Sequence, residues 1–207
     1  MDLRHTFAVV TTSLDGDVLA RLALVDEPFT PGQLHRLLPD ASLDGVRRCL
    51  NRLAEQGVVD RTRAGQRAFA YRLNRDHVAA PAIIALANTP ATVRQRIQDE
   101  LATWQIPPVY GAVFGSWARG SATTASDLDL FLVRPDDADE QTWEAQIGRI
   151  EHLATRWTGN DARTLVLPEQ HVLDHPDDPV LTSIRQEGLT VAGNPPWLRT
   201  RLRKAAR

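Results

Sequence analysis

The chain has 207 residues, of which 43% are hydrophobic and 24% charged, and its formal net charge is −2 at pH 7. This composition is ordinary for a globular protein, and the length allows one large or two small domains that each bury a core. No apolar stretch approaches the ~20 residues of a membrane-spanning helix, no signal-peptide pattern begins the chain, and the single cysteine excludes an internal disulfide. We therefore expect a cytoplasmic protein without a membrane partner.

The first part of the chain predicts short helices. An apolar pattern over residues 18–24 indicates the first of them. Thr30 as N-cap, Pro31 at the first helical position and Gln33 closing a capping box predict a second helix that continues through Leu38.

A third helix is predicted after Ser42, because apolar residues recur at helical spacing over residues 43–53. The other face of this helix is polar and basic, with Arg47, Arg48, Asn51 and Arg52. After Gly57 the apolar residues alternate, which predicts a β-hairpin, and the tip of this hairpin carries Arg61, Arg63 and Arg67. Positive charge collects on these elements, since residues 41–75 hold eight arginines against three acids.

Three helices followed by a basic hairpin resemble the winged helix-turn-helix DNA-binding domains of the ArsR and MarR kind. The resemblance implies that the third helix enters the major groove of double-stranded DNA and that the hairpin reaches phosphates or the minor groove. The implied DNA contacts are Arg47, Arg48, Asn51, Arg52, Arg61, Arg63 and Arg67. Because two or three phosphate contacts give only weak binding, we expect specific recognition to need a homodimer. The alternative is a protein-interaction module whose arginines are simply solvated.

A second domain is expected after a connecting helix and hinge at residues 76–88. Thr89 begins a helix with an apolar stripe, formed by Val93, Ile97, Leu101 and Trp104, which indicates packing against a sheet. A further helix over residues 143–157 is expected to end at a glycine cap, Gly159. The expected division of the chain is residues 1–75, the linker helix at 76–88, the second domain at 89–195 and a basic tail at 196–207.

Two carboxylates stand one residue apart inside an apolar run. If this run is a strand, Asp127 and Asp129 project from one face, and the leucines at positions 128, 130 and 132 project from the other. Two like charges side by side are tolerable when a cation lies between them, and Mg²⁺ is the usual ion for oxygen ligands beside phosphates. Upstream, Gly115 and Ser116 follow another apolar run, and such a turn lets backbone N–H groups approach phosphate oxygens.

Gly115-Ser116, a ten-residue spacer and Asp127-Leu128-Asp129 resemble the signature of the polymerase-beta-like nucleotidyltransferases, and most closely their minimal branch. The resemblance implies transfer of a nucleoside monophosphate from an NTP with release of pyrophosphate. It also implies that Asp127 and Asp129 hold two Mg²⁺ ions. The implied nucleotide contacts are Gly115, Ser116, Arg119 and Ser126.

The third carboxylate of the family is not found where it is expected. The neighbouring strand, predicted at residues 162–167, places Arg163 or Thr164 at that point, depending on its register. Asp161, at the mouth of the strand, is the candidate for the third catalytic acid, and Glu169 lies beyond the far end of the strand.

The expected fold class is therefore α+β with two domains, a winged helix-turn-helix followed by a mixed β-sheet flanked by helices in the nucleotidyltransferase fold. Two functions remain open. The first is a Mg²⁺-dependent nucleotidyltransferase that moves an NMP, with ATP as the favoured donor, to a hydroxyl of a protein, a tRNA or other RNA, or a small molecule, in a toxin-antitoxin or defence operon. The second is a transcriptional regulator that binds NTP without turning it over.

Overall fold

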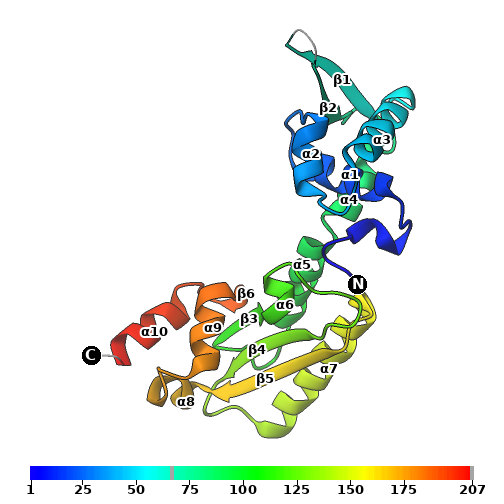
Figure 1. The fold of residues 1–207 in the computed structure, drawn as a ribbon. Coiled ribbons are helices and arrows are strands. Elements are labelled where there is room, and N and C mark those ends of the chain that lie inside the picture. Colours follow the sequence, from blue (N-terminus) through cyan, green and yellow to red (C-terminus); the bar gives the residue numbers. More distant parts are fainter. Residues whose placement is uncertain (66–67, 206–207) are drawn as a thin grey trace. The chain divides into compact units, whose positions relative to one another are not determined.

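The computed structural model describes residues 1–65 and 68–205, and the chain divides into two compact units. The N-terminal unit is His5–Pro90, and the C-terminal unit combines Met1–Arg4 with Ala91–Arg207. Each unit has a hydrophobic core of its own, and each is described separately (Figure 1).

The N-terminal unit is mainly helical and carries one two-stranded sheet. Its elements are η1 (Thr6–Val9), α1 (Leu14–Leu24), α2 (Pro31–Leu37), α3 (Leu43–Glu55), β1 (Val59–Ala64), β2 (Ala68–Leu73) and α4 (Ala80–Ala87). β1 and β2 are antiparallel, and Phe29 extends this sheet by one isolated bridge to Tyr71. The arginine at position 67, predicted at the hairpin tip, lies outside the described residues.

The predicted caps explain where α2 and α3 begin. The N–H of Gln33 donates to the hydroxyl of Thr30, and the N–H of Thr30 donates to the side chain of Gln33 at 2.7 Å, so the predicted capping box is confirmed. The hydroxyl of Ser42 accepts from the N–H of Gly45 at 3.0 Å at the start of α3. Both helices then bury their apolar faces in the core of the unit.

α4 falls within the connecting helix expected at residues 76–88, but it is packed into the N-terminal unit. Three of its side chains, Ala80, Ile83 and Ala87, belong to the buried core of the N-terminal unit. Small side chains allow close packing, and α4 lies against α1. The compact unit consequently extends to Pro90.

The C-terminal unit is a four-stranded mixed sheet covered by helices. Its elements are α5 (Thr89–Ala102), β3 (Tyr110–Phe114), α6 (Gly115–Ala118), β4 (Leu128–Arg134), α7 (Glu140–Thr158), β5 (Ala162–Pro168), α8 (Glu169–Asp174), α9 (Pro179–Glu187), β6 (Leu189–Gly193) and α10 (Trp197–Ala205). The strand order is β5-β4-β3-β6, with β3 antiparallel to β4 and β6, and β4 parallel to β5.

Alternation along β4 divides the core of this unit into two layers. Leu128, Leu130 and Leu132 pack with side chains of α5 and α7, as predicted for the apolar stripe of α5. Phe131 and Val133 point to the opposite face, where α8, α9 and α10 cover the sheet (Figure 1). The two Asp side chains share the parity of Phe131, so the face covered by α8, α9 and α10 is the one that carries the site.

The end of α7 agrees with the sequence prediction, and the C-terminal tail differs from it. α7 ends at Thr158 and is capped by Gly159, whose left-handed φ of 73° makes it the glycine cap that the sequence predicts. The basic tail, by contrast, forms α10 on the sheet. Trp197 stacks on Tyr110 with ring centroids 5.7 Å apart, and Leu198 is buried, so two apolar side chains hold a helix that is otherwise strongly basic.

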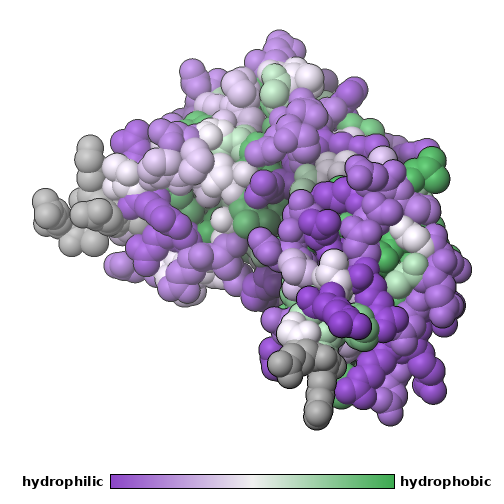
Figure 2. All heavy atoms as spheres, turned by 90° about the horizontal axis from the view of Figure 1, so that it is seen from above, coloured by the Kyte–Doolittle hydropathy of each residue, from purple (hydrophilic) through white to green (hydrophobic). Residues whose placement is uncertain are grey.

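None of the helices within the described ranges is long and apolar enough to cross a membrane. Figure 2 shows one face of the molecule, on which hydrophilic residues predominate and hydrophobic ones are scattered in small areas. Large apolar side chains with high exposure include Val10 and Val78, which belong to separate segments of the N-terminal unit.

Candidate functional site

Asp127 and Asp129 lie at the beginning of β4, at an end of a strand that is otherwise buried. Asp127 immediately precedes the strand, and Asp129 pairs laterally with Phe114 of β3 and Arg163 of β5. The prediction that the neighbouring leucines face the other way is confirmed. The two carboxylates therefore project side by side from one face of the sheet.

Their surroundings disfavour two negative charges. Burial raises the pKa of Asp129 above its ordinary 3.8, and the nearby charge of Asp127 raises it further, while Arg163 and Arg119 act in the opposite direction. A divalent cation between the two carboxylates would relieve this repulsion. Such a pair at a strand end is typical of a functional site rather than of a stabilising one.

Gly115 brings the turn after β3 directly against Asp129. Its φ is +67°, which a residue with a side chain rarely adopts, and a Cβ atom at this position would lie 2.6 Å from Oδ2 of Asp129. Ser116 follows in the single turn of α6, where its carbonyl accepts from the N–H of Ser121 at 2.9 Å. The Gly-Ser turn and the Asp pair thus form one continuous surface.

Arg119, a predicted nucleotide contact, forms an ion pair that the sequence does not predict. Its Nη1 donates to Oε1 of Glu187, at the end of α9, at 2.7 Å. This guanidinium lowers the pKa of Glu187, and the hydroxyl of Ser183 and the N–H of Gly115 contribute to the same effect. Glu187 is thus an anion that already lies against the turn proposed to bind phosphate, and no local pattern in the sequence reveals it.

Ser126 and Asn160 build the loop that leads into the Asp pair. The hydroxyl of Ser126 accepts from the N–H of Thr123 at 2.9 Å, so it closes the loop on itself. Asn160 is 1% exposed, and its Nδ2 donates to the carbonyls of Thr123, at 2.8 Å, and Ser126, at 2.6 Å. Asn160 therefore positions the backbone next to Asp127.

The register of β5 decides which residue lies beside the Asp pair. Arg163 is opposite Asp129, and Thr164 is opposite Leu130, on the face toward α7. Nη1 of Arg163 lies 3.1 Å from Oδ2 of Asp127, and its Nε donates to Oδ2 of Asp161 at 3.1 Å. The position where the family resemblance implies a third acid therefore holds a cation.

Asp161 and Glu169, the two acids predicted near β5, do not lie at the position of Arg163. Asp161 is at the same end of the sheet as Asp127, and its carbonyl accepts from the N–H of Leu128 at 2.8 Å, but its carboxylate faces Arg163. Glu169 begins α8 at the far end of β5, where it lies 3.8 Å from Arg201.

The carboxylates present fit one divalent ion and not two. Asp127 and Asp129 supply two adjacent anionic ligands, which is the contribution that a Mg²⁺ ion bound mainly by phosphates and water requires from a protein. A second ion would need a further carboxylate from β5, where Arg163 is placed instead. Within the described ranges, no group of three or more His, Cys, Asp or Glu side chains is arranged to hold a metal.

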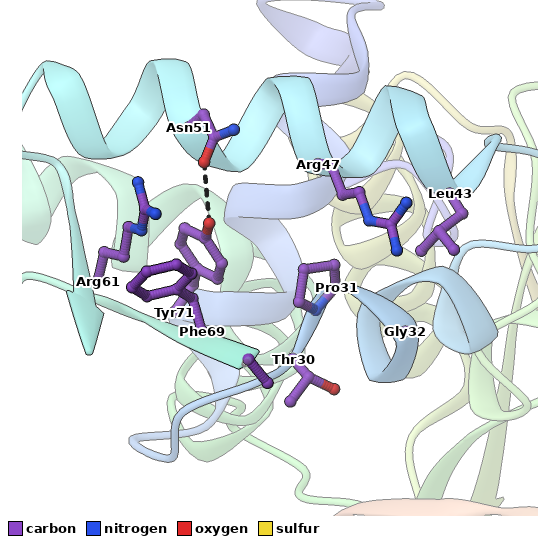
Figure 3. Close-up of a pocket in the computed structure, with 10 residues that line it drawn as sticks. Thr30, Pro31, Gly32, Leu43, Arg47, Asn51, Arg61, Phe69 and Tyr71 are labelled. Atoms are coloured by element: carbon purple, nitrogen blue, oxygen red, sulfur yellow. Dashed lines mark hydrogen bonds between the residues drawn. The ribbon is translucent and has the colours of Figure 1, made fainter. Parts of the chain in front are cut away.

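In the N-terminal unit, three of the predicted DNA contacts surround one pocket. The pocket has a volume of about 330 Å³ and lies between α2, α3 and the β1–β2 sheet (Figure 3). It is lined by Arg47 and Asn51 of α3, Arg61 of β1, and Phe69 and Tyr71 of β2, among others.

Aromatic residues of β2 fix two of these three side chains. The hydroxyl of Tyr71 donates to Oδ1 of Asn51 at 2.9 Å, so the NH₂ group of Asn51 remains for an external acceptor (Figure 3). The guanidinium of Arg61 stacks 3.6 Å from the centre of the Phe69 ring. Two guanidinium groups and an amide donor in a partly aromatic hollow suit phosphate oxygens and base edges.

Three further predicted DNA contacts, Arg48, Arg52 and Arg63, do not line this pocket. Arg52 forms an ion pair with Asp15 of α1, which also accepts a hydrogen bond from the thiol of Cys49 at 2.9 Å. Arg48 and Arg63 are exposed, and neither forms an ion pair within the described part of the chain. Arg47 pairs with Asp44 at 3.0 Å, an exposed contact of the kind that contributes little to stability.

Residues 98–166 match a family model described as a nucleotidyltransferase domain. This segment contains the Gly-Ser turn, the Asp pair and the first residues of β5. No curated protein matches the chain. Among solved structures, a mutant of the toxin-antitoxin pair MntA-HpeT is similar at 12% identity and a TM-score of 0.40, covering 55% of this chain and 83% of that chain. A toxin-antitoxin structure with AMP-PNP is similar at 14% identity and the same TM-score and coverage.

Proposed function

We propose that the C-terminal unit binds an NTP at the Gly-Ser turn and the Asp pair, and that it transfers the nucleoside monophosphate to a hydroxyl group. The observation that carries this proposal is the direct contact between Gly115 and Asp129. It puts a turn that has no room for a side chain next to two carboxylates, inside the segment that matches a nucleotidyltransferase domain.

The residues divide the task between binding and chemistry. The turn at Gly115 and Ser116 and the guanidinium of Arg119 bind the outer phosphates. Asp127 and Asp129 would hold Mg²⁺, which when bound supplies positive charge against the triphosphate. The acceptor hydroxyl attacks the α-phosphorus, the bond to the β-phosphate breaks, pyrophosphate leaves, and the hydroxyl proton passes to Asp161.

ATP is the proposed donor, and the acceptor is a hydroxyl of a protein, an RNA or a small molecule. Incubation with Mg²⁺, NTPs labelled in the α-phosphate and an extract of the cells that produce the protein should label an acceptor. The variants Asp127→Asn and Asp129→Asn should abolish this label. Labelling that persists in both variants would contradict the assignment of the Asp pair.

A second function is favoured by Arg163. A cation in place of the third acid suits a protein that binds NTP and responds to it without transfer, because the acid that helps to activate the acceptor is missing at its expected position. In that case NTP should change the affinity of the chain for DNA while no pyrophosphate is released.

For the N-terminal unit we propose a winged helix-turn-helix module that binds double-stranded DNA, with α3 in the major groove and the β1–β2 hairpin as wing. The convergence of Arg47, Asn51 and Arg61 on one pocket supports this proposal. Arg52 is left out of the surface because it does not line the pocket and pairs instead with Asp15 of α1. A homodimer bound to the operator of its own operon, in a toxin-antitoxin or defence system, is the form in which both functions would act together.

Duplex binding measured by fluorescence anisotropy at low salt tests the module. The double variant Arg47→Ala/Arg61→Ala should weaken binding at least tenfold, since each lost phosphate contact removes one released counterion. Unchanged affinity at low salt would favour the protein-interaction alternative.

A further inference from the structure

Arg163 forms more than an ordinary surface ion pair, because it contacts two carboxylates beside the proposed nucleotide site. It stands opposite Asp129 in the parallel register of β4 and β5, so its side chain leaves the sheet on the same face as the Asp pair. The guanidinium uses two of its edges at once, Nη1 toward Asp127 and Nε toward Asp161, both at 3.1 Å. One cation is thereby placed among three carboxylates at the mouth of the proposed nucleotide site.

A guanidinium in this place has two physical consequences. It has no acceptor atom, so it is unable to ligate a metal, and its charge repels a second divalent ion from the carboxylates it contacts. It is also a planar fork of N–H donors that matches phosphate oxygens as well as it matches carboxylates. Its side chain is 66% exposed, so it is free to exchange one partner for another.

We propose that Arg163 is a built-in cation of the nucleotide site that takes the place of the second divalent ion. The triphosphate then binds with a single divalent ion held by Asp127 and Asp129. Arg163 turns from Asp127 to a phosphate oxygen when NTP enters. This inference rests on the proposed NTP site and specifies its ion content.

The ion content is measured by titrating the full chain with Mn²⁺ in the presence of a non-hydrolysable ATP analogue and counting bound ions by electron paramagnetic resonance. The wild type should bind one Mn²⁺ per chain. Arg163→Asp, which restores a third carboxylate at the expected position, should bind two.

Nucleotide affinity provides a second readout that does not depend on turnover. Arg163→Gln should weaken binding of the analogue about tenfold with one Mn²⁺ still bound, because a charge-assisted contact to phosphate is lost. The matched control is Arg149→Gln on α7, which breaks an ion pair with Glu100 of α5 on the other face of the sheet and should leave the affinity unchanged.

Two Mn²⁺ ions on the wild-type chain, or an unchanged affinity of Arg163→Gln, would overturn the inference and leave the proposed function intact. A wild-type chain that is folded, as judged by circular dichroism, and binds no analogue at any Mn²⁺ concentration would contradict the proposed function as well.

Discussion

The Cα of Gly115 is packed against the carboxylate of Asp129, so closely that a single added methyl group would lie 2.6 Å from Oδ2. The residue after β3 and the start of β4 are therefore in direct contact. A change at the turn alters the Asp pair, and a change at the Asp pair alters the turn.

Gly115→Ala should abolish measurable NTP binding and destabilise the C-terminal unit. The alanine meets both a left-handed backbone and the Asp129 carboxylate, and a penalty of about 1–2 kcal/mol is expected from the backbone alone. Isothermal calorimetry and urea unfolding measure the two effects. The control is Gly148→Ala, at an exposed position of α7 with nothing within 4 Å, which should stabilise the helix by about 0.5–1 kcal/mol. Equal behaviour of the two variants would contradict the tight contact.

Asp129→Asn should make the chain more stable than the wild type at neutral pH when no divalent ion is present. Burial and Asp127 raise the pKa of Asp129 above 3.8, so over the pH range just above 3.8 the folded chain binds more protons than the unfolded chain. The free energy of unfolding consequently falls as pH rises through this range, and the asparagine removes that loss.

Thermal unfolding in EDTA, followed from acid to neutral pH, tests whether the free energy of unfolding falls as pH rises. The advantage of Asp129→Asn should shrink as pH falls toward 3.8. Asp139→Ala should show the opposite pH dependence. The hydrogen bond with Thr142 lowers the pKa of Asp139, so the stabilisation by this carboxylate is present above its ordinary pKa and is lost as pH falls. A pH-independent advantage for Asp129→Asn would show that the charge is not the cause.

The local features of the site were predictable because they depend on short-range patterns. The alternation of Asp and Leu fixes which side chains share a face of β4, and Thr30 with Gln33 fixes where α2 begins. The partner of Asp129 across β4 and β5 was not predictable. A shift of one residue exchanges Arg163 for Thr164 and turns the other to the opposite face, and nothing within the sequence of β5 sets that register.

Contacts between segments far apart in the chain were also not predictable from the sequence. Asn160 and Ser126 are 34 residues apart, and Arg119 and Glu187 are 68 apart, so neither pair produces a local pattern. Arg52 shows a different limit. It neighbours Asn51 on α3, but one residue along a helix rotates the side chain by roughly 100°, and this is enough to direct it to Asp15 instead of the pocket.

Asn160→Ala should destabilise the C-terminal unit by about 1–3 kcal/mol, because two partly buried carbonyl groups, of Thr123 and Ser126, lose their donor. The same change should weaken NTP binding at temperatures where the variant is fully folded, since the loop leading to Asp127 loses its anchor. Urea unfolding and calorimetry separate the two effects. If nucleotide affinity is unchanged in the folded variant, Asn160 acts on stability alone.

Tyr71→Phe should lower the affinity for duplex DNA about three- to tenfold without removing any group that contacts DNA. The lost hydroxyl is the donor to Oδ1 of Asn51, and without it the amide is free to rotate and presents its NH₂ group only part of the time. Because no charge is lost, the dependence of affinity on salt should stay the same.

Arg61→Ala serves as the contrasting variant, since loss of one phosphate contact should reduce the slope of log affinity against log salt by about 0.9. Arg52→Ala, whose guanidinium is paired with Asp15, should leave both quantities nearly unchanged. Anisotropy titrations at several salt concentrations distinguish the three patterns. A loss of salt dependence in Tyr71→Phe, or full affinity in that variant, would show that the Tyr71–Asn51 hydrogen bond does not prepare the pocket for DNA.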